Sequence, residues 1–188
     1  MQKLLVFDFD DTLWPLNEIA TSLLGIDYNK ITTFICDDNP NLTKEEKMAL
    51  NAMYKSVELW KHVVLDEEAD TLMELETDNV KVCINSNCSS PEVMAYKEEM
   101  LSPLLRIPKN QIFLKLGSRK KEMIPGTFTF MDDSPHNIYD SIASYNIVPS
   151  KPWNADLTNV YRCKNVKEAK DIIKQIIKYE NLWGIIWN

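Results

Sequence analysis

The sequence has few glycines, four in 188 residues. A Gly-rich loop that holds a dinucleotide needs several glycines close together, so this class of site is not expected. No apolar run approaches the ~18–20 residues that span a bilayer. The N-terminal segment meets an acid at Asp8 and lacks the long apolar region and small-residue cleavage site of a signal peptide. We therefore expect a cytoplasmic protein with no membrane partner.

Cysteine pairs and positive charge are also lacking. The four cysteines are scattered without a CxxC spacing, which is typical of free thiols in a reducing compartment. Lys and Arg number 21 against 28 Asp and Glu, which gives a formal net charge of −7. A broad basic surface for a long nucleic acid is therefore not expected.

The residues that are present indicate an ordinary globular chain, with 45 % hydrophobic and 26 % charged residues. Short apolar runs end abruptly in polar residues, which is typical of buried parallel strands. Three of these runs are strong and two are weaker: Lys3–Phe7, Val80–Ile84, Thr127–Met131, then Ile112–Leu116 and Asn146–Val148.

Helical patterns lie between the expected strands. A Ser-Ser-Pro-Glu start at Ser89–Glu92 opens one helix that runs to about Leu101. Ser134-Pro135 opens another that runs through about Tyr145, and apolar spacing marks an amphipathic helix over 166–177. Alternating strands and helices predict an α/β protein with a doubly wound, mostly parallel sheet.

One segment breaks this alternation. Between Pro15 and Asp78 there is no convincing strand, and three stretches are helical in pattern: Asn17–Leu24, Thr43–Glu58 and Glu67–Glu76. A plain crossover needs only about a dozen residues. We therefore expect a small helical cap at 15–78, inserted in a catalytic core made of 1–14 and 79–188. The cap has five lysines against fourteen acids, a net charge of −9, which favours a small substrate over a long polyanion.

Polar side chains follow three of the expected strands: Asp8, Asp10 and Thr12, then Ser86 and Asn87, then Asp132 and Asp133. Ligands of open α/β sheets bind at the carboxyl ends of the strands, so these groups are expected to meet. Crowded carboxylates are tolerable when a divalent cation is bound, and oxygen ligands suit Mg²⁺. The sequence therefore predicts a magnesium site.

The pair Asp8 and Asp10 also predicts a chemistry. Alternation along an extended segment places both side chains on one side. One carboxylate could attack an electrophile while the other handles a proton. A carboxylate is a competent nucleophile toward phosphorus, which gives an aspartyl-phosphate.

These motifs resemble those of the haloacid dehalogenase superfamily of phosphatases. The segment FDFDDTLW at Phe7–Trp14 resembles its DxDxT motif, INSN at Ile84–Asn87 its second motif, and FMDDSPHNI at Phe130–Ile138 its acidic pair. A narrower resemblance is to the 5'(3')-deoxyribonucleotidase family, which places a helical cap directly after the first motif. That family usually has Gly where this chain has Asp11. The TLWP segment, Thr12–Pro15, also resembles the magnesium-dependent phosphatase family.

The resemblance implies a Rossmann-like core and a Mg²⁺-dependent phosphomonoesterase. Asp8 would be the nucleophile, and Asp10 would protonate the leaving oxygen and then accept a proton from water. The metal would be held by Asp8, the Asp10 carbonyl and Asp132 or Asp133. Phosphate would be bound by a set of four residues: Thr12, Ser86, Asn87 and, in the Arg-x-Lys-like SRKKEM segment, Lys121.

Several choices stay open at this level. Lys120 and Lys115 compete with Lys121, and either Asp132 or Asp133 could be the metal ligand. Aromatic residues of the cap could stack on a nucleobase, with Trp14 and Phe34 preferred for their nearness to the first motif. The apolar tail Leu182–Trp187 either packs on the domain or forms a partner surface, such as that of a homodimer.

The favoured substrate is a nucleoside monophosphate, most of all a deoxyribonucleotide. A second hypothesis is a magnesium-dependent phosphatase that acts on a sugar phosphate or a phosphoprotein. A third is a catalytically silent module that binds phosphate or a partner. The intact acidic motifs argue against the third, since a silent domain has no need to keep them all.

Overall fold

The computed structural model of the chain describes residues 2–117 and 123–186, with side chains up to residue 181. Its centre is a six-stranded sheet in the order β3-β2-β1-β4-β5-β6, and every neighbouring pair is parallel. The strands are β1 (Lys3–Phe7), β2 (Val80–Cys88), β3 (Ile112–Leu116), β4 (Thr127–Met131), β5 (Tyr145–Pro149) and β6 (Tyr161–Cys163). The expectation of an α/β protein with a parallel sheet is confirmed.

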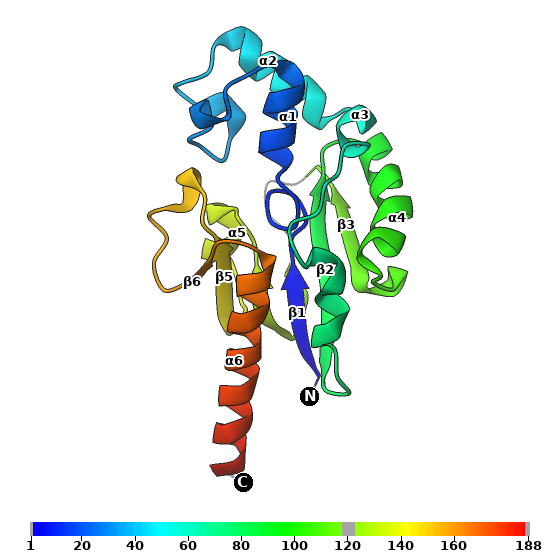
Figure 1. Cartoon of the computed structure of the whole chain (residues 1–188), viewed down its shortest axis with the longest axis vertical. Helices are drawn as coiled ribbons and strands as arrows, with labels where there is room; N and C mark the ends of the chain where they lie inside the picture. Colours follow the sequence, from blue (N-terminus) through cyan, green and yellow to red (C-terminus); the bar gives the residue numbers. More distant parts are fainter. Residues whose placement is uncertain (1, 118–122, 187–188) are drawn as a thin grey trace.

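Helices connect and cover the strands (Figure 1). The α-helices are α1 (Leu16–Leu24), α2 (Lys44–Tyr54), α3 (Val57–Trp60), α4 (Pro91–Leu105), α5 (Pro135–Tyr139) and α6 (Val166–Ile186). Short 3-10 helices are η1 (Tyr28–Lys30), η2 (Cys36–Asp38), η3 (Ala69–Leu75), η4 (Lys109–Gln111) and η5 (Pro152–Asn154). Good start signals explain several of these boundaries, such as the Thr43–Glu46 capping box of α2 and the Ser90 cap with Pro91 of α4.

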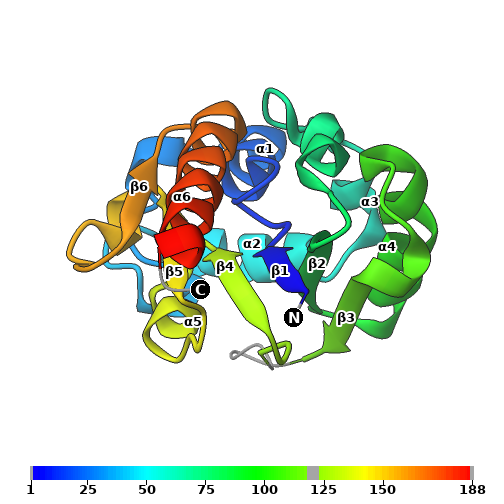
Figure 2. The same ribbon diagram turned by 90° about the horizontal axis from the view of Figure 1, so that it is seen from below.

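The two faces of the sheet are covered unequally. Leu5 and Phe7 of β1 belong to the large core, which also contains buried residues of α4, η3 and α6. Val6, which points to the opposite face, belongs to a smaller cluster with Phe130 and Ile138 of α5. Figure 2 shows α6 and the short α5 on opposite sides of the strands.

The helices between β1 and β2 are α1, η1, η2, α2, α3 and η3, joined by turns and loops. The helices α1 and α2 contact each other and lie beyond the carboxyl ends of the strands, whereas η3 packs on β2, α4 and α6 (Figure 1). The last part of this segment therefore joins the core layer. The division into a core and a cap at 15–78 stays a prediction, and α1 to α3 are the part that stands over the strand ends.

The structure shifts several expected boundaries. The helix expected over Thr43–Glu58 is two helices, since the chain breaks at Lys55 and restarts at the Ser56 cap of α3. The α5 helix ends at Tyr139, well short of the expected Tyr145. The three-residue strand β6 was not expected, and α6 continues beyond the expected end at 177. Side chains of the apolar tail 182–187 lie outside the described residues.

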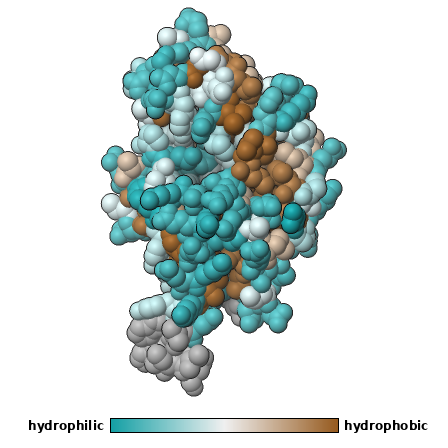
Figure 3. All heavy atoms as spheres, viewed as in Figure 1, coloured by the Kyte–Doolittle hydropathy of each residue, from teal (hydrophilic) through white to brown (hydrophobic). Residues whose placement is uncertain are grey.

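Exposed apolar side chains are spread over the surface. In the view of Figure 3, hydrophobic residues are visible mainly over the segment between β1 and β2, and hydrophilic residues cover most of the lower half. Leu23 and Val64 of that segment are among the exposed large hydrophobic residues. Across the described ranges, no helix combines the length and the apolar character that crossing a membrane requires.

Candidate active site

The carboxyl ends of β1, β2 and β4 meet beneath α1 and α2. The chain leaves β1 toward β2 on one side and later returns to β4 on the other, so β1 and β4 flank the point where the strand order reverses. The backbone N–H of Asp8 donates to the Met131 carbonyl at 2.8 Å, which extends the ladder between the two strands past their ends. The acidic motifs of both strands are thereby held side by side.

Three buried carboxylates form a cluster at this point: Asp8, Asp132 and Asp133 each offer an oxygen within 4.8 Å of the others. They are 4 %, 0 % and 2 % exposed. Buried like charges at this separation repel strongly, and a divalent cation would offset that repulsion. An all-oxygen donor set suits Mg²⁺, so the residues present fit the ion that the motifs imply. Both members of the acidic pair belong to the cluster, so the choice between them stays open.

Neighbouring groups fix the acidic pair. Asp132 accepts hydrogen bonds from the backbone N–H of Ser134 at 2.8 Å and from the Asn137 amide at 3.0 Å. Asp133 accepts the indole N–H of Trp153 at 2.9 Å. Orientation by such surrounding donors is common around metal-binding carboxylates. The sequence assigned neither residue a role, although Asn137 lies within the Phe130–Ile138 motif, five residues after Asp132. Trp153 is 20 residues from Asp133 in the chain.

Asp10 is held by a lysine from α4. The ammonium of Lys97 lies 2.7 Å from Asp10 Oδ2, 2.9 Å from Ser86 Oγ and 3.1 Å from the Asn87 carbonyl. Lys97 is completely buried, whereas the Asp10 side chain is 24 % exposed and faces the pocket. A buried lysine is stable only when it is paired and hydrogen-bonded, and here three oxygens surround it. Lys97 is therefore the lysine that the described residues bring to Asp10.

The choice of Lys121 as the phosphate-binding lysine stays a prediction. Lys121 and its competitor Lys120 lie outside the described residues. Lys115 is half-buried on β3 and lines a different pocket, beside Met123. The sequence did contain a signal for Lys97, because it stands in the spacing of a buried helical stripe. The neighbours on that stripe are Val93, Leu101 and Leu105, all buried on the inner face of α4.

Ser86 and Asn87 end β2 beside this lysine. Ser86 is fully buried and accepts a hydrogen bond from Lys97, while Asn87 lines the pocket. Asn87 therefore lies where the strand-end argument expected it, whereas Ser86 is not among the residues that line the pocket. Thr12 does not line it either. Its hydroxyl is 3.3 Å from Asp133 Oδ1 and accepts the Asp133 backbone N–H at 3.2 Å, so in this structure Thr12 joins the two acidic motifs rather than facing a phosphate.

The two aromatic residues preferred for base stacking differ in their burial. Trp14 is 1 % exposed and packs against Phe9 and Trp60, with ring centroids 6.0 and 5.3 Å away. A ring this deeply buried cannot stack on a base in the pocket, so the prediction for Trp14 is wrong. Phe34 is 38 % exposed, lines the pocket and meets the His136 ring edge-on at 6.2 Å. Phe34 thus remains available to a substrate.

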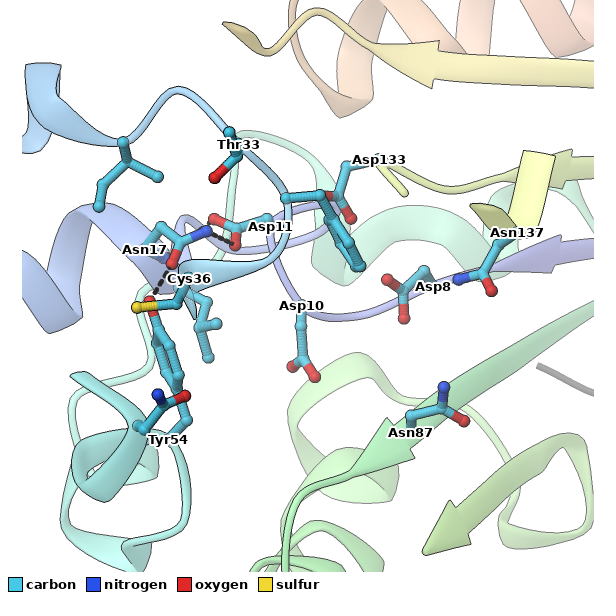
Figure 4. A pocket seen from close by; sticks show the side chains of 14 residues that line it. Asp8, Asp10, Asp11, Asn17, Thr33, Cys36, Tyr54, Asn87, Asp133 and Asn137 are labelled. Atoms are coloured by element: carbon cyan, nitrogen blue, oxygen red, sulfur yellow. Dashed lines mark hydrogen bonds between the residues drawn. The ribbon is translucent and has the colours of Figure 1, made fainter. Parts of the chain in front are cut away.

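A pocket of about 270 Å³ opens over the carboxylates (Figure 4). The core contributes Asp8, Asp10, Asp11, Asn87, Asp133 and Asn137, and the helical segment contributes Leu16, Asn17, Ile31, Thr33, Phe34, Cys36, Asn51 and Tyr54. The charged side chains among these described residues are all acidic. The wall opposite the acids is mixed, with apolar rings and chains interrupted by amide and hydroxyl groups, which suits a small organic moiety.

Asp11 links the strand end to the helices above it. Its two oxygens accept the backbone N–H of Asn17 at 3.0 Å and the Asn17 amide at 2.6 Å, and the Tyr54 hydroxyl in turn donates to Asn17 (Figure 4). Asp11 has a φ of +54°, a left-handed conformation that favours Gly and that Asp tolerates better than most residues. This explains why a resembling family has Gly here, and Asp11 adds a tie to α1 and α2.

The same burial alters the acidity of Asp11. Its pKa is raised from 3.8 to about 7, chiefly by burial, with Lys151 and the Asn17 N–H acting in the opposite direction. The charge of Asp10 adds to the increase. Ionisation of Asp11 at neutral and higher pH therefore lowers the stability of the folded chain.

No family model and no curated protein sequence matches this chain. Among solved structures, it is similar to a HAD-superfamily hydrolase of subfamily IA, variant 1, from Geobacter sulfurreducens PCA. The TM-score is 0.50 at 14 % sequence identity, and the match covers 92 % of this chain and 100 % of that one. At this identity the likeness shows the fold. The six-stranded parallel sheet with its flanking helices is a Rossmann-like α/β fold that this hydrolase shares.

The carboxylate cluster leads to a prediction about metal binding. Mg²⁺ should stabilise the wild-type chain, by about 2.7 kcal/mol at a concentration 100 times its Kd. In Asp132→Asn and Asp133→Asn, the remaining carboxylates should repel one another less without metal, and Mg²⁺ should raise the stability less than it does in wild type. Thermal unfolding at increasing Mg²⁺ concentration measures this difference. The control is Asp38→Asn at an exposed acid in η2, which should respond like wild type. An equal gain in all four proteins would contradict a metal site at this cluster.

Asp11 leads to a prediction about pH. The folded chain binds a proton at Asp11 more tightly than the unfolded chain does, so the free energy of unfolding should fall as the pH rises from about 4 to about 7. Asn cannot ionise, so the stability of Asp11→Asn relative to wild type should increase across this window and level off above it. Urea unfolding in metal-free buffer at several pH values measures the difference. A difference that stays constant or shrinks with pH would refute this account of Asp11.

Proposed function

We propose that the chain is a HAD-superfamily phosphomonoesterase that hydrolyses a nucleoside monophosphate, with Mg²⁺ as cofactor and Asp8 as nucleophile. One observation carries the proposal: the buried cluster of Asp8, Asp132 and Asp133 and the Asp10–Lys97 ion pair share one pocket, which Asp8, Asp10 and Asp133 line. These groups would serve as nucleophile, proton carrier, cation and metal ligands, and the fold is one that a known hydrolase shares.

Asp8 is the group suited to attack. It lies at the end of β1, lines the pocket floor and is 4 % exposed, so its carboxylate is oriented by the sheet and shielded from bulk water. One oxygen of Asp8 would bond to phosphorus as the bond from phosphorus to the leaving oxygen breaks. Bound Mg²⁺ would neutralise charge on the phosphoryl oxygens and on the crowded carboxylates.

Asp10 would move the proton. It lies two residues after Asp8 in the same pocket and is the more exposed of the two carboxyl groups. Its carboxyl group would give a proton to the departing oxygen and then take one from the water that hydrolyses the aspartyl-phosphate. Lys97, which contacts both Asp10 and Ser86, would supply positive charge close to the transferring group.

The pocket wall supports a nucleoside as the leaving group. Phe34 offers an exposed aromatic ring, and Asn51 and Tyr54 of α2 offer polar groups within the same pocket. Aromatic faces bind the flat surface of a base, and amide groups can hydrogen-bond its edge. The acidic lining disfavours a second phosphate group, since it would add negative charge beside Asp11 and Asp133.

The proposal is tested with a panel of phosphate esters assayed with and without Mg²⁺. We expect hydrolysis of nucleoside monophosphates, with deoxyribonucleotides among the best substrates, and loss of turnover when the metal is chelated. Asp8→Asn should reduce kcat by about 10⁴-fold or more, because the amide cannot act as the nucleophile. Its thermal stability should not fall, since the change removes a buried like charge from the cluster.

The controls separate the candidate functions. Asp38→Asn, on the exposed part of η2, should keep wild-type turnover. Preference for sugar phosphates or a phosphoprotein would move the assignment to the magnesium-dependent phosphatase alternative. Near-wild-type activity of Asp8→Asn would exclude Asp8 as the nucleophile. No Mg²⁺-stimulated hydrolysis of any ester, including an aryl phosphate, would favour a silent binding module.

A further inference from the structure

Two buried tryptophans surround the Asp10–Lys97 ion pair without reaching the pocket. Trp14 lies four residues after Asp10 in the chain. Its indole N–H donates to Asp10 Oδ1 at 3.3 Å, and the Lys97 ammonium donates to Asp10 Oδ2 at 2.7 Å. Both oxygens of this carboxyl group therefore meet a donor. With one donor the carboxyl plane could rotate, whereas two donors on separate oxygens define its orientation.

Trp60 contacts the lysine of this ion pair. The Lys97 ammonium lies 4.2 Å from the centroid of the Trp60 ring and 5.7 Å from that of Phe9, both within the range of cation–π attraction. Trp60 packs against Trp14 at 5.3 Å, so the two indoles support each other. Trp60 is the last residue of α3, in the helical segment between β1 and β2.

The indole nitrogen of Trp60 gives an independent clue. It is buried and has no hydrogen-bond partner among the described residues. A buried N–H without a partner costs about 1–3 kcal/mol, a penalty that Phe or Leu would avoid in the same place. The chain thus has Trp at this position despite the cost of its N–H. The feature of Trp that Phe and Leu match least well is its large π face, which lies over the buried cation.

We propose that Trp14 and Trp60 form an aromatic clamp, a pair of positioning residues that hold the Asp10 carboxyl group and Lys97 in the geometry for phosphoryl transfer. The inference rests on the proposed function, and it assigns a role to two residues that touch no substrate. Trp14 orients the group that protonates the leaving oxygen. Trp60 keeps the ammonium of Lys97 between Asp10 and Ser86.

The clamp has a consequence that depends on the leaving group. When phosphorus transfers to Asp8, a nucleoside alkoxide is a strong base and needs the proton of Asp10 as its bond to phosphorus breaks. A nitrophenolate is a weak base and leaves without that proton. Misorientation of Asp10 should therefore slow hydrolysis of an alkyl phosphate far more than hydrolysis of p-nitrophenyl phosphate. A general loss of folding would slow both equally.

The test measures kcat/KM of wild type and Trp14→Phe for a nucleoside monophosphate and for p-nitrophenyl phosphate, with Mg²⁺. Phe keeps the ring against Trp60 and removes the N–H. We expect kcat/KM to fall about 10-fold or more for the nucleotide and less than about 3-fold for the aryl ester, as befits part of a general-acid contribution. The control is Phe128→Leu, a buried ring in the amino-terminal half of β4 that packs on Tyr145, which should leave the ratio of the two substrates unchanged.

Trp60 is tested by a conservative and a disruptive variant. Trp60→Phe keeps an aromatic face and should retain most of the wild-type kcat/KM. Trp60→Leu removes the face and should lower kcat/KM for both substrates about 10-fold, because Lys97 loses its cation–π contact. If kcat/KM falls equally in the two variants, Trp60 only fills space, and it is not a positioning residue of the clamp.

The outcomes distinguish the two proposals. If wild type hydrolyses neither ester, the proposed function fails and the clamp fails with it. If wild type is active and Trp14→Phe slows both esters by the same factor, or neither, the function stands and Trp14 is not a positioning residue. Only an unequal loss, larger for the nucleotide, supports the clamp.

Discussion

Crowding of negative charge at the carboxyl ends of β1 and β4 is the constraint on which the rest of the site depends. The parallel pairing of these strands brings Asp8, just past the end of β1, against the acidic pair just past the end of β4. The surrounding structure offsets this charge with fixed donors, such as the Asn137 amide and the Trp153 indole, and with the buried ammonium of Lys97. What remains is a donor set that favours a divalent cation and a phosphoryl group bound to it.

The helical segment between β1 and β2 then serves the site in two ways. From above it supplies the pocket wall that includes Phe34 and Tyr54, and Asp11 ties that wall to the strand end through Asn17. From the side it supplies Trp60, which covers Lys97. The segment that would choose the substrate is thus in contact with the groups that would carry out the chemistry. A change in the packing of this segment should therefore alter the position of Asp10 as well as the pocket wall.

Much of this arrangement is predictable from the sequence, because strands that end in acids are a local pattern. The runs before Asp8 and Asp132 mark their strands, and a parallel sheet then requires the acids to meet. Lys97 was missed because its partners are distant in the chain, although its place on the stripe of Val93 and Leu101 was a readable signal. Trp14 was misjudged because nearness to a motif says nothing of which way a ring points. The short β6 has too few residues to form a pattern.

The proposed function requires that Asp8 form a covalent bond to phosphorus. This bond is tested by incubating the chain with Mg²⁺ and a nucleoside monophosphate labelled in its phosphoryl group, quenching in acid during turnover and mapping the label. We expect an acyl phosphate on the peptide that contains Asp8, stable in acid and released by hydroxylamine. Turnover without any labelled chain, or a label on a different residue, would contradict this expectation.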